Sequence, residues 1–432
     1  MNVNDSEILA GILEAEGFYE TLDFKEADVI IANTCCVRET AERKAHGFLN
    51  ELKHLKRSRP DLTIVVSGCM SQKDKHELLR TKPFIDLVLG PNSIYRLPSL
   101  LRKLRLAKRP MIDVREHHIP DFKKLPIKRR QGPSAYVSII YGCNNFCSFC
   151  IVPYVRGREV SRPKEDIIRE IEELNKSVFK EVVLLGQNVN SYKSGERGKG
   201  GKSDKSEKRE RSGLAELLEE VHKIEEIERI RFLTSHPRDM SDDIIMTVKE
   251  LPKVCEFFHL PIQSGDNEML KKMNRGYTVD YYRGLVDKIR KEIPDVAITS
   301  DVVVGFPGET DEQFENTLNI IKEIEFDAVN TAAYSLRQGT AAAKMSGHLP
   351  EEVKKERLQA VMKVVEETAW KVNQKLIAKT VEVLVDRSGM GRTRGNKIVK
   401  FPGGEELIGK VVNVNIVEAK SWVLAGHLNP NF

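Results

Sequence analysis

The chain has 432 residues, enough for about three domains of ordinary size. Apolar residues make up 40% of it and charged residues 31%, which excludes collagen-like, mucin-like and wholly disordered proteins. No stretch approaches the roughly 18 uninterrupted apolar residues of a membrane span, and the first residues lack the basic start and apolar core of a secretory signal. A cytosolic protein without a membrane segment is therefore expected. The net charge of +5 is too small to indicate a partner by itself.

The first hundred residues alternate between helical and extended patterns. Helices are expected over 5–18 and 39–56. Short apolar runs, typical of buried parallel strands, occupy 27–34, 62–67 and 87–90. This alternation predicts an α/β domain over residues 1–100, built on a doubly wound parallel sheet.

The next segment, residues 101–131, is strongly basic. Up to residue 130 it contains eleven Lys and Arg against three Asp and Glu, and three prolines interrupt it. The pattern favours a solvated linker, although a basic strip facing a polyanion is an alternative.

From residue 132 the strand–helix alternation resumes and repeats six times. Strands are expected at 135–141, 181–186, 229–234, 257–261, 296–305 and 328–334. Six parallel units predict a partial (β/α)6 barrel over 132–368 rather than a closed eightfold one. Residues 193–213 contain hardly an apolar residue and predict a disordered insertion.

The last part of the chain changes character after a long helical stretch expected over 351–378. Short alternating runs separated by Gly-rich turns occupy 381–385, 397–401, 409–416 and 421–426. They predict a small antiparallel β-barrel within residues 369–432.

Seven cysteines carry the chemical signal. They are Cys35, Cys36, Cys69, Cys143, Cys147, Cys150 and Cys255. An odd number in a chain without an export signal argues against a disulfide framework and favours metal or catalytic chemistry.

Three of them form a C-x3-C-x2-C loop after the first expected barrel strand: Cys143, Cys147 and Cys150. Three thiolates on one loop can hold three irons of a four-iron cluster and leave the fourth iron open to chelate a small molecule. A structural zinc site is the alternative, but it requires four closed ligands, and no fourth Cys or His follows at metal spacing. The three cysteines are therefore candidate catalytic and metal-ligating residues.

The sequence around this loop, GCNNFCSFCIVPYVRGRE at 142–159, resembles the methylthiotransferase family of radical S-adenosylmethionine enzymes. Within that family it is most similar to the tRNA 2-methylthio-N6-dimethylallyladenosine synthases. Further matches are LLGQNVNSY (184–192), TSHPRDMSDD (234–243), FHLPIQSGDNEMLKKMNRGYT (258–278), DVVVGFPGET (301–310) and YSLRQGT (334–340). Only the 193–213 insertion falls clearly outside the resemblance.

The resemblance implies methylthiolation of C2 of N6-dimethylallyladenosine next to the anticodon of tRNA. It implies two [4Fe-4S] clusters and S-adenosylmethionine, which would bind the open iron of the cluster on the C-x3-C-x2-C loop. Candidate S-adenosylmethionine contacts lie in loops at the strand ends, where plain turns or buried structural hydrogen bonds are the alternatives. They are Gln187, Asn188, Ser235, Gln263, Gly305, Gly308 and Glu309, with His236 on the same rim.

Cys35 and Cys69 end the first two strands of the N-terminal domain, where residues of a doubly wound sheet converge on the ligand crevice. The resemblance implies that they are the second and third ligands of a second cluster, implicated in sulfur delivery; two unrelated buried cysteines are the alternative. The side chain of Cys36 is expected to point the other way, and Cys255 is expected to be a packed core thiol. Neither is assigned to a cluster.

One departure from the family concerns the first ligand of that cluster. In the family it lies in a Gly-Cys-Gln segment before a Met-Asn-x-x-Asp-Ser-Glu helix, and this sequence begins at that methionine. A first strand and its cysteine are therefore expected to be missing, through a start codon assigned too late or through a real truncation. Two alternative functions stay open: methylthiolation of threonylcarbamoyladenosine in tRNA, and an RNA-binding protein inactive through loss of this ligand.

The C-terminal barrel resembles the TRAM domain, an RNA-binding module. Its GRTRGNK segment presents Arg392, Arg394 and Lys397, which suit phosphate and base contacts, with a solvated turn as the alternative. The expected partners are a tRNA anticodon stem-loop, an electron donor such as a flavodoxin or ferredoxin, and an iron–sulfur or sulfur carrier protein. A monomer is expected.

Overall fold

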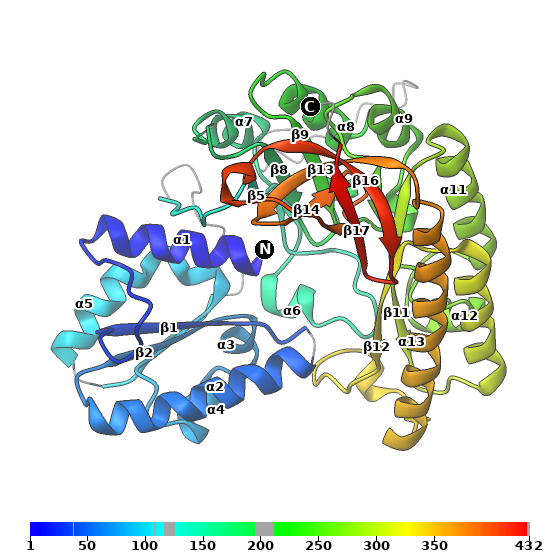
Figure 1. Ribbon diagram of the computed structural model, residues 1–432. Helices are drawn as coiled ribbons and strands as arrows, with labels where there is room; N and C mark the ends of the chain where they lie inside the picture. Colours follow the sequence, from blue (N-terminus) through cyan, green and yellow to red (C-terminus); the bar gives the residue numbers. More distant parts are fainter. Residues whose placement is uncertain (38, 108, 116–125, 176, 195–210, 430–432) are drawn as a thin grey trace, which may run out of the picture. The chain divides into compact units, whose positions relative to one another are not determined.

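The computed structural model describes residues 1–37, 39–107, 109–115, 126–175, 177–194 and 211–429 (Figure 1). The chain forms two compact units. The first comprises residues 1–130, 141–146 and 150–160, and the second comprises residues 131–140, 147–149 and 161–432. Most of the expected insertion at 193–213, namely residues 195–210, lies outside the described residues.

The first unit is built on a four-stranded parallel sheet in the order β1-β2-β3-β4. Its strands are β1 (Val29–Thr34), β2 (Thr63–Gly68), β3 (Leu87–Leu89) and β4 (Met111–Asp113). Both β2 and β3 are almost wholly apolar, because helices cover both faces of a parallel sheet. The expected α/β domain on a parallel sheet is thereby confirmed.

Helices cover the two faces of this sheet. One face carries α1 (Asn2–Ala15), η1 (Pro91–Arg96) and α5 (Leu97–Ala107). The other carries α2 (Glu39–Ser58), α3 (Cys69–Asp74) and α4 (His76–Thr81), together with the short helix α6 (Val152–Arg156). Alternation along β2 divides its side chains, so that Ile64 and Val66 pack on the second face and Val65 on the first.

The expected linker over 101–131 needs correction. Residues 101–107 continue α5, and residues 111–113 form β4, which pairs with β3. The helix has an apolar stripe at Leu97, Leu100, Leu101 and Leu104, all buried, and its basic residues occupy the solvent side. The first part of this basic segment is therefore an amphipathic helix and not a linker. Residues 116–125 lie outside the described residues.

The second unit contains the six expected barrel strands, in two parallel three-stranded sheets. They are β5 (Ser134–Ser138), β8 (Glu181–Leu185) and β9 (Arg229–Leu233), then β10 (Phe257–His259), β11 (Ala297–Val304) and β12 (Ala328–Ala333). A parallel bridge between Ile230 and Val254 connects the two sheets. The partial barrel is thus confirmed.

Helices alternate with these strands around a large apolar core. They are α7 (Lys164–Glu172), α8 (Gly213–His222), α9 (Asp242–Glu250), α10 (Asn267–Lys272), α11 (Val279–Glu292), α12 (Asp311–Ile324) and α13 (Glu351–Gln374). Short 3-10 turns η3 (Val189–Ser191), η4 (Pro237–Asp239) and η5 (Ala342–Lys344) follow strand ends, and two short strands, β6 (Ile140–Tyr141) and β7 (Val160–Ser161), flank the cysteine loop. None of the described helices is long and apolar enough to cross a membrane.

The C-terminal part of this unit is a closed barrel in the order β13-β14-β15-β17-β16. Its strands are β13 (Thr380–Arg387), β14 (Met390–Thr393), β15 (Ile398–Lys400), β16 (Val411–Ala419) and β17 (Val423–Leu428), with a 3-10 turn η6 (Glu405–Leu407). Strand β14 differs from the prediction, because its Gly-Arg-Thr sequence is typical of a turn. Arg392 therefore lies on a strand and not in a loop.

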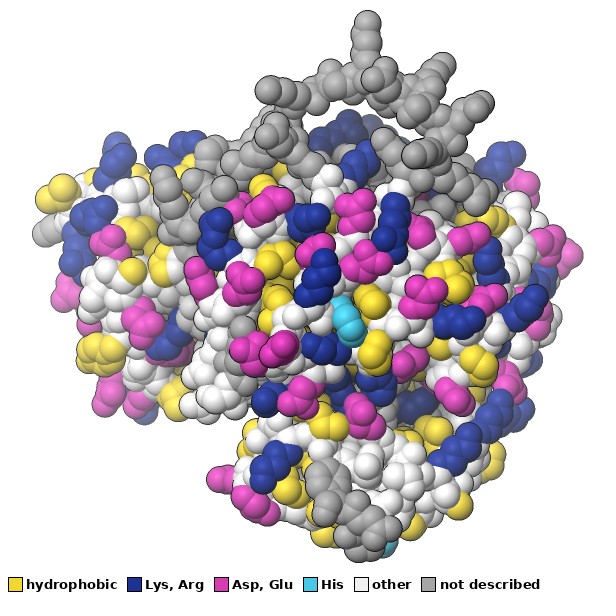
Figure 2. All heavy atoms as spheres, turned by 90° about the horizontal axis from the view of Figure 1, so that it is seen from above, with side chains coloured by type: hydrophobic (Ala, Val, Ile, Leu, Met, Phe, Trp, Pro, Cys, Tyr) yellow, Lys and Arg dark blue, Asp and Glu magenta, His cyan; other side chains and the backbone are white. Residues whose placement is uncertain are grey.

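Charged side chains of both signs are interspersed over the described surface shown in Figure 2. The small net charge of +5 is not gathered into one basic area on that face.

Candidate functional site

The cysteine loop begins at a position that only glycine can occupy. Gly142 has φ +70°, and a Cβ atom there would lie 2.1 Å from the carbonyl oxygen of Arg158. The next residue, Cys143, donates its backbone N–H to the carbonyl of Gly157 at 3.2 Å. The start of the loop is therefore fixed against the segment that follows it.

The middle of the loop is fixed by bonds to backbone carbonyls of the second unit. Ser148 donates its N–H to the carbonyl of Met273 at 3.0 Å and its hydroxyl to that of Lys272 at 2.8 Å. Ser148 also accepts the N–H of Ala342 at 2.8 Å. The residue next to Cys147 thus has a well-defined position.

Arg275 donates from Nη1 to the Sγ atom of Cys147 at 3.1 Å. It is 4% exposed, and its other nitrogens bond the carbonyl of Pro261 at 2.8 Å and the hydroxyl of Tyr277 at 3.0 Å. A buried guanidinium suits a thiolate, which is the form of cysteine that binds iron. Sequence reasoning missed Arg275, although the NRGYT motif contains it.

Buried polar atoms without protein partners follow several strands of the six-stranded barrel. They are Ser235 Oγ and His236 Nε2 after β9, Gln263 Oε1 after β10 and Tyr334 Oη after β12, each without a hydrogen bond to any described residue. Leaving such an atom buried and unpaired costs about 1–3 kcal/mol, so their repetition at one end of the barrel indicates a polar ligand.

The backbone at this end of the barrel is also strained. Thr234 and Gln263 adopt φ angles of +72° and +73°, in the left-handed region that non-glycine residues rarely occupy. The donors and acceptors at this end of the barrel fit S-adenosylmethionine, because it presents amino, carboxylate, hydroxyl and adenine groups.

The ring of His236 is neutral. Burial, with Arg275 and Arg238 nearby, lowers its pKa to about 2. Its Nδ1 atom accepts the backbone N–H of Arg238 at 3.3 Å, which assigns the ring proton to Nε2. The unpartnered Nε2 is then an N–H donor available to a ligand.

Asn188 and Glu309 hold loops in place. The side-chain amide of Asn188 donates to Asp239 at 2.6 Å and accepts the N–H of His236 at 3.1 Å, so it joins the loops after β8 and β9. Glu309 Oε2 accepts from the Gly305 N–H and from Arg357, both at 2.6 Å. Burial raises the pKa of Glu309, and its second oxygen, Oε1, has no partner among the described residues.

The other predicted contacts lie on the same rim. Gly305 has φ +71°, and a Cβ atom there would lie 2.4 Å from Lys354 Cγ, so close packing requires this glycine. Gly308 also has a positive φ, and Gln187 is half-buried. Their contact with a cofactor stays a prediction.

In the first unit, Cys35 and Cys69 directly follow two paired strands. Thr34 of β1 lies opposite Gly68 of β2, so the two cysteines follow directly after neighbouring strand ends. Arg156 donates from Nε to Cys69 Sγ at 3.3 Å and forms an ion pair with Asp5 at 2.6 Å. This arginine was not singled out from the sequence.

The position of Cys36 differs from the prediction. Its side chain is completely buried, and its thiol donates a hydrogen bond to the sulfur of Cys69. That bond, followed by the nearby Arg156, lowers the pKa of Cys69 to about 6, against the effect of burial, and the same bond raises the pKa of Cys36. The prediction assumed that side chains alternate between the two faces, as in a strand. It was wrong because the strand ends at Thr34, before Cys35 and Cys36. Three thiols, not two, therefore belong to this region.

Two other groups do not extend the site. Cys255 is buried, and burial raises its pKa, as suits a core thiol. Among the described residues, Glu42, His46 and Asp74 place possible ligand atoms within 4.8 Å of one another, but the Lys73 ammonium pairs with both carboxylates. Lys73 therefore already neutralises these carboxylates, and the group gives no indication of a bound metal ion.

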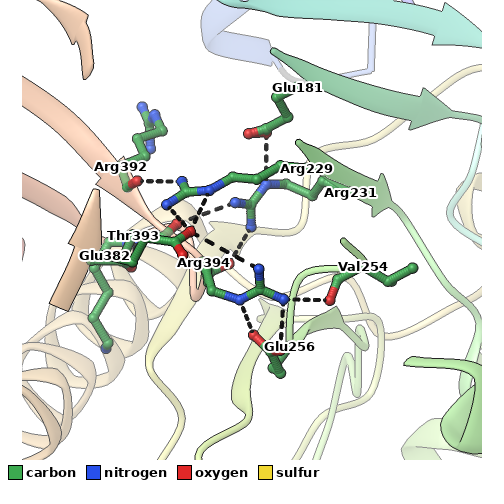
Figure 3. Close-up of polar contacts among 10 residues, drawn as sticks. Glu181, Arg229, Arg231, Val254, Glu256, Glu382, Arg392, Thr393 and Arg394 are labelled. Atoms are coloured by element: carbon green, nitrogen blue, oxygen red, sulfur yellow. Dashed lines mark hydrogen bonds and ion pairs between the residues drawn. The ribbon is translucent and has the colours of Figure 1, made fainter. Parts of the chain in front are cut away.

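The segment predicted to bind RNA contacts the six-stranded barrel (Figure 3). Arg394 pairs with Glu256 at 2.6 Å and donates to the carbonyl of Val254 at 2.8 Å. Lys397 pairs with Asp327 at 2.5 Å. These partners neutralise both charges, so the prediction of RNA contacts for Arg394 and Lys397 loses support.

Two buried arginines complete this interface from the other side (Figure 3). Arg229 pairs with Glu382 at 2.6 Å and donates to the carbonyl of Arg392 at 2.8 Å. Arg231 pairs with Glu181 at 3.1 Å and donates to the carbonyl of Arg394 at 2.7 Å. The Arg392 side chain remains 43% exposed, with Asp386 at 3.6 Å, and is the one of the three predicted cations that favours an RNA contact.

Comparison with known proteins agrees with this architecture. Residues 137–321 match the radical SAM superfamily, residues 1–90 the uncharacterized protein family UPF0004, and residues 374–428 the TRAM domain. A solved structure of the radical S-adenosylmethionine methyltransferase TsrM from Kitasatospora setae superposes with a TM-score of 0.56 at 14% identity, covering 78% of this chain and 70% of that one. At that identity the likeness concerns the fold alone.

Full-length relatives are much more similar. Proteins named tRNA-2-methylthio-N(6)-dimethylallyladenosine synthase are 49% identical in Caldicellulosiruptor saccharolyticus and 46% identical in Acetivibrio thermocellus. Each match covers 99% of this chain, with 90% and 88% of the relatives. The fold and the cysteine loop thus define a radical S-adenosylmethionine protein. Within that superfamily, the chain belongs to the family of the tRNA-2-methylthio-N(6)-dimethylallyladenosine synthases.

Proposed function

We propose that this protein methylthiolates C2 of N6-dimethylallyladenosine next to the anticodon of tRNA. The observation that carries the proposal is the complete C-x3-C-x2-C loop on a barrel whose strand ends present buried, unpartnered polar atoms. The names of the full-length relatives support the substrate.

Cys143, Cys147 and Cys150 would hold a [4Fe-4S] cluster whose open iron takes S-adenosylmethionine. Bound there, the two supply one-electron chemistry that can act on an unactivated C–H bond, which acid–base catalysis cannot. Two S-adenosylmethionine molecules would be used, one for the radical step and one as the methyl donor.

The chain's own residues orient the cofactor. The Ser235 hydroxyl, the Gln263 amide and the neutral His236 ring offer hydrogen bonds that no described residue takes up. Because His236 is neutral, its Nε2–H group can donate a hydrogen bond without adding a positive charge beside the cationic sulfonium. The bonds of Asn188 and Glu309 keep the surrounding loops in position.

A second cluster would be held by Cys35 and Cys69, with Cys36 beside them as a third thiol. We further propose that the C-terminal barrel binds the tRNA anticodon stem-loop, with Arg392 as one contact. A flavodoxin or ferredoxin would supply electrons, an iron–sulfur or sulfur carrier protein would serve the clusters, and the protein would act as a cytoplasmic monomer.

The substrate is tested in a host strain that lacks its own methylthiotransferase. We expect expression of this chain to convert N6-dimethylallyladenosine into its 2-methylthio form, detected by mass spectrometry of tRNA nucleosides. A methylthio group on threonylcarbamoyladenosine instead would contradict the proposed substrate. The Cys143→Ala variant is the matched negative control.

The clusters are tested by anaerobic reconstitution. About eight irons per chain indicate two four-iron clusters, and about four indicate one. We expect Cys143→Ala to lose about four irons and all cleavage of S-adenosylmethionine. Cleavage that survives in this variant would refute the assignment of the barrel loop, and a wild-type chain that binds neither iron nor S-adenosylmethionine would favour an inactive RNA-binding protein.

A further inference from the structure

Each of the two cysteine groups has one buried arginine that donates an N–H to a cysteine sulfur. Arg275 donates to Cys147 at 3.1 Å, and Arg156 donates to Cys69 at 3.3 Å. Arg275 is 4% exposed and Arg156 is 9% exposed, so bulk water does not compete with the sulfur atoms for their N–H groups. The same arrangement occurs in two unrelated folds of the chain, a parallel sheet and a barrel.

Each arginine is also fixed by partners other than sulfur. Arg275 bonds the carbonyl of Pro261 and the hydroxyl of Tyr277, which is itself bonded to the same carbonyl at 3.0 Å. Arg156 is fixed by the carboxylate of Asp5 at 2.6 Å. Because these bonds hold the guanidinium groups in buried positions, their N–H donors are aimed at the sulfurs before any cluster binds.

We propose that Arg156 and Arg275 are positioning residues that raise the reduction potential of the clusters bound by Cys69 and Cys147. The inference rests on the proposed function, since it requires clusters at both groups. Reduction adds one electron to a cluster, and a charged N–H donor to a ligating sulfur stabilises the more negative form. Removing the donor therefore shifts the potential to more negative values.

The two arginines differ in their other partners, and this difference predicts unequal effects. Apart from the sulfur, Arg275 bonds a carbonyl and a hydroxyl, both neutral, so no carboxylate among these partners offsets its positive charge beside Cys147. The charge of Arg156 is partly cancelled by Asp5. We expect the larger shift at the barrel cluster.

The barrel arm uses the full chain with Cys35, Cys36 and Cys69 replaced by Ala, reconstituted anaerobically. Redox titration followed by electron paramagnetic resonance gives the midpoint potential, and iron content gives occupancy. We expect Arg275→Gln to retain iron and to shift the midpoint to more negative values, with a smaller shift for Arg275→Lys. Arg283→Gln is the control, because the ion pairs of Arg283 with Asp280 and Glu323 are exposed, and no shift is expected.

The second arm uses the chain with Cys143, Cys147 and Cys150 replaced by Ala. We expect Arg156→Gln to shift the midpoint of the remaining cluster in the same direction but by less. Arg102→Gln is the control there, because its ion pair with Glu16 is exposed.

The outcomes separate this inference from the proposed function. An unchanged midpoint in Arg275→Gln at wild-type iron content would overturn the inference and leave the proposed function intact. Iron lost in Arg275→Gln but retained with a more negative midpoint in Arg275→Lys would support it, because the shift then follows from the changed donor. Loss of iron with equal destabilisation by Gln and Lys would overturn it in favour of a purely structural role. A wild-type chain without iron would overturn the proposed function and this inference together.

Discussion

His236 illustrates how burial sets the charge of a single side chain. Its ring lies edge-on to Tyr277, with a centroid distance of 5.7 Å, and has Arg275 and Arg238 as electrostatic neighbours. Protonation would place a third positive charge in a space shielded from water, which explains its low pKa. The protein therefore gains a neutral N–H donor where an ordinary histidine would titrate near pH 6.5.

This environment makes stability depend on pH. The pKa of His236 is about 2 in the folded protein, whereas the unfolded chain has the ordinary value of 6.5. Between these values the unfolded chain binds the proton and the folded protein does not, so the free energy of unfolding falls as the pH drops below about 6.5. The limiting slope is about 1.4 kcal/mol per pH unit. Urea unfolding at pH 7.5 and 5.5 should show a larger loss for the wild type than for His236→Gln; equal losses would contradict the assignment.

The buried ion pair of Arg357 gives a second prediction for a single residue. Its guanidinium pairs with Glu309 at 2.6 Å, and both side chains are buried. Arg357→Met leaves the carboxylate buried without its partner, which we expect to cost about 3–5 kcal/mol in free energy of unfolding. Lys355→Met, on the exposed side of the same helix, should change it by less than about 0.5 kcal/mol. Equal effects of the two substitutions in urea unfolding would show that the pair is not needed.

Single residues were predictable to different extents. The thiols and strand-end polar residues have motifs, and the order of strands placed Ser235 and Gln263 on the rim. Nothing in the local sequence indicates that Arg156 contacts Cys69, 87 residues away, or that Arg275 contacts Cys147, 128 residues away. Such contacts depend on tertiary packing, to which periodicity and composition are insensitive.

At the scale of elements, the loop between β11 and α12 joins the rim to the helical layer. Its first residue, Gly305, packs against α13, and Glu309 closes the loop by accepting the Gly305 N–H. Thr310 then begins α12 with a capping box, in which its hydroxyl and the Gln313 side chain each bond the other's backbone N–H. The loop is therefore held at both ends and in its middle.

A pair of glycines tests what this packing requires. Gly305 and Gly339 both have positive φ, but a Cβ atom at Gly305 would meet Lys354, whereas at Gly339 it would meet nothing within 4 Å. Gly339→Ala should cost only the backbone term of about 1 kcal/mol. We expect Gly305→Ala to cost clearly more and to weaken binding of S-adenosylmethionine, measured by thermal unfolding and by equilibrium dialysis of the reconstituted protein. Equal costs would mean that Lys354 moves aside freely.

Elements were predictable where one pattern dominated. The six barrel strands were found because each is an apolar run between helices. Helix α5 was not predicted, because its basic residues interrupt the apolar stripe at Leu97, Leu100 and Leu104 along the sequence. Strand β14 was missed because a Gly-Arg-Thr segment has neither β-branched alternation nor apolar residues, and it is held by pairing with β13 and β15.

At the scale of the second unit, the interface in Figure 3 attaches the C-terminal barrel to the six-stranded one. Its acceptors and donors lie at the amino ends of consecutive strands: Glu181 begins β8, Arg229 begins β9, and Glu256 precedes β10. The candidate cofactor residues lie at the carboxyl ends of the same strands. The two ends of the six-stranded barrel therefore have different tasks.

This division gives a prediction for RNA binding. Arg392→Gln should weaken tRNA binding and reduce the slope of log affinity against log salt concentration by about 1, because one phosphate contact is lost. Arg394→Gln should leave that slope unchanged and instead lower the unfolding temperature, because Glu256 and the carbonyl of Val254 lose their donor. Filter binding at several salt concentrations measures the slopes. A reduced slope for Arg394→Gln alone would reverse the roles of the two residues.

The position of the C-terminal barrel also constrains the path of a bound nucleic acid. A tRNA that touches Arg392 and also inserts a base among Ser235, His236 and Gln263 must extend along the flank of the six-stranded barrel, for the full length of its strands. The protein surface along this path would then shield consecutive riboses of the anticodon arm. A nuclease or hydroxyl-radical footprint of the bound tRNA should be one continuous tract, not two protected patches separated by accessible backbone.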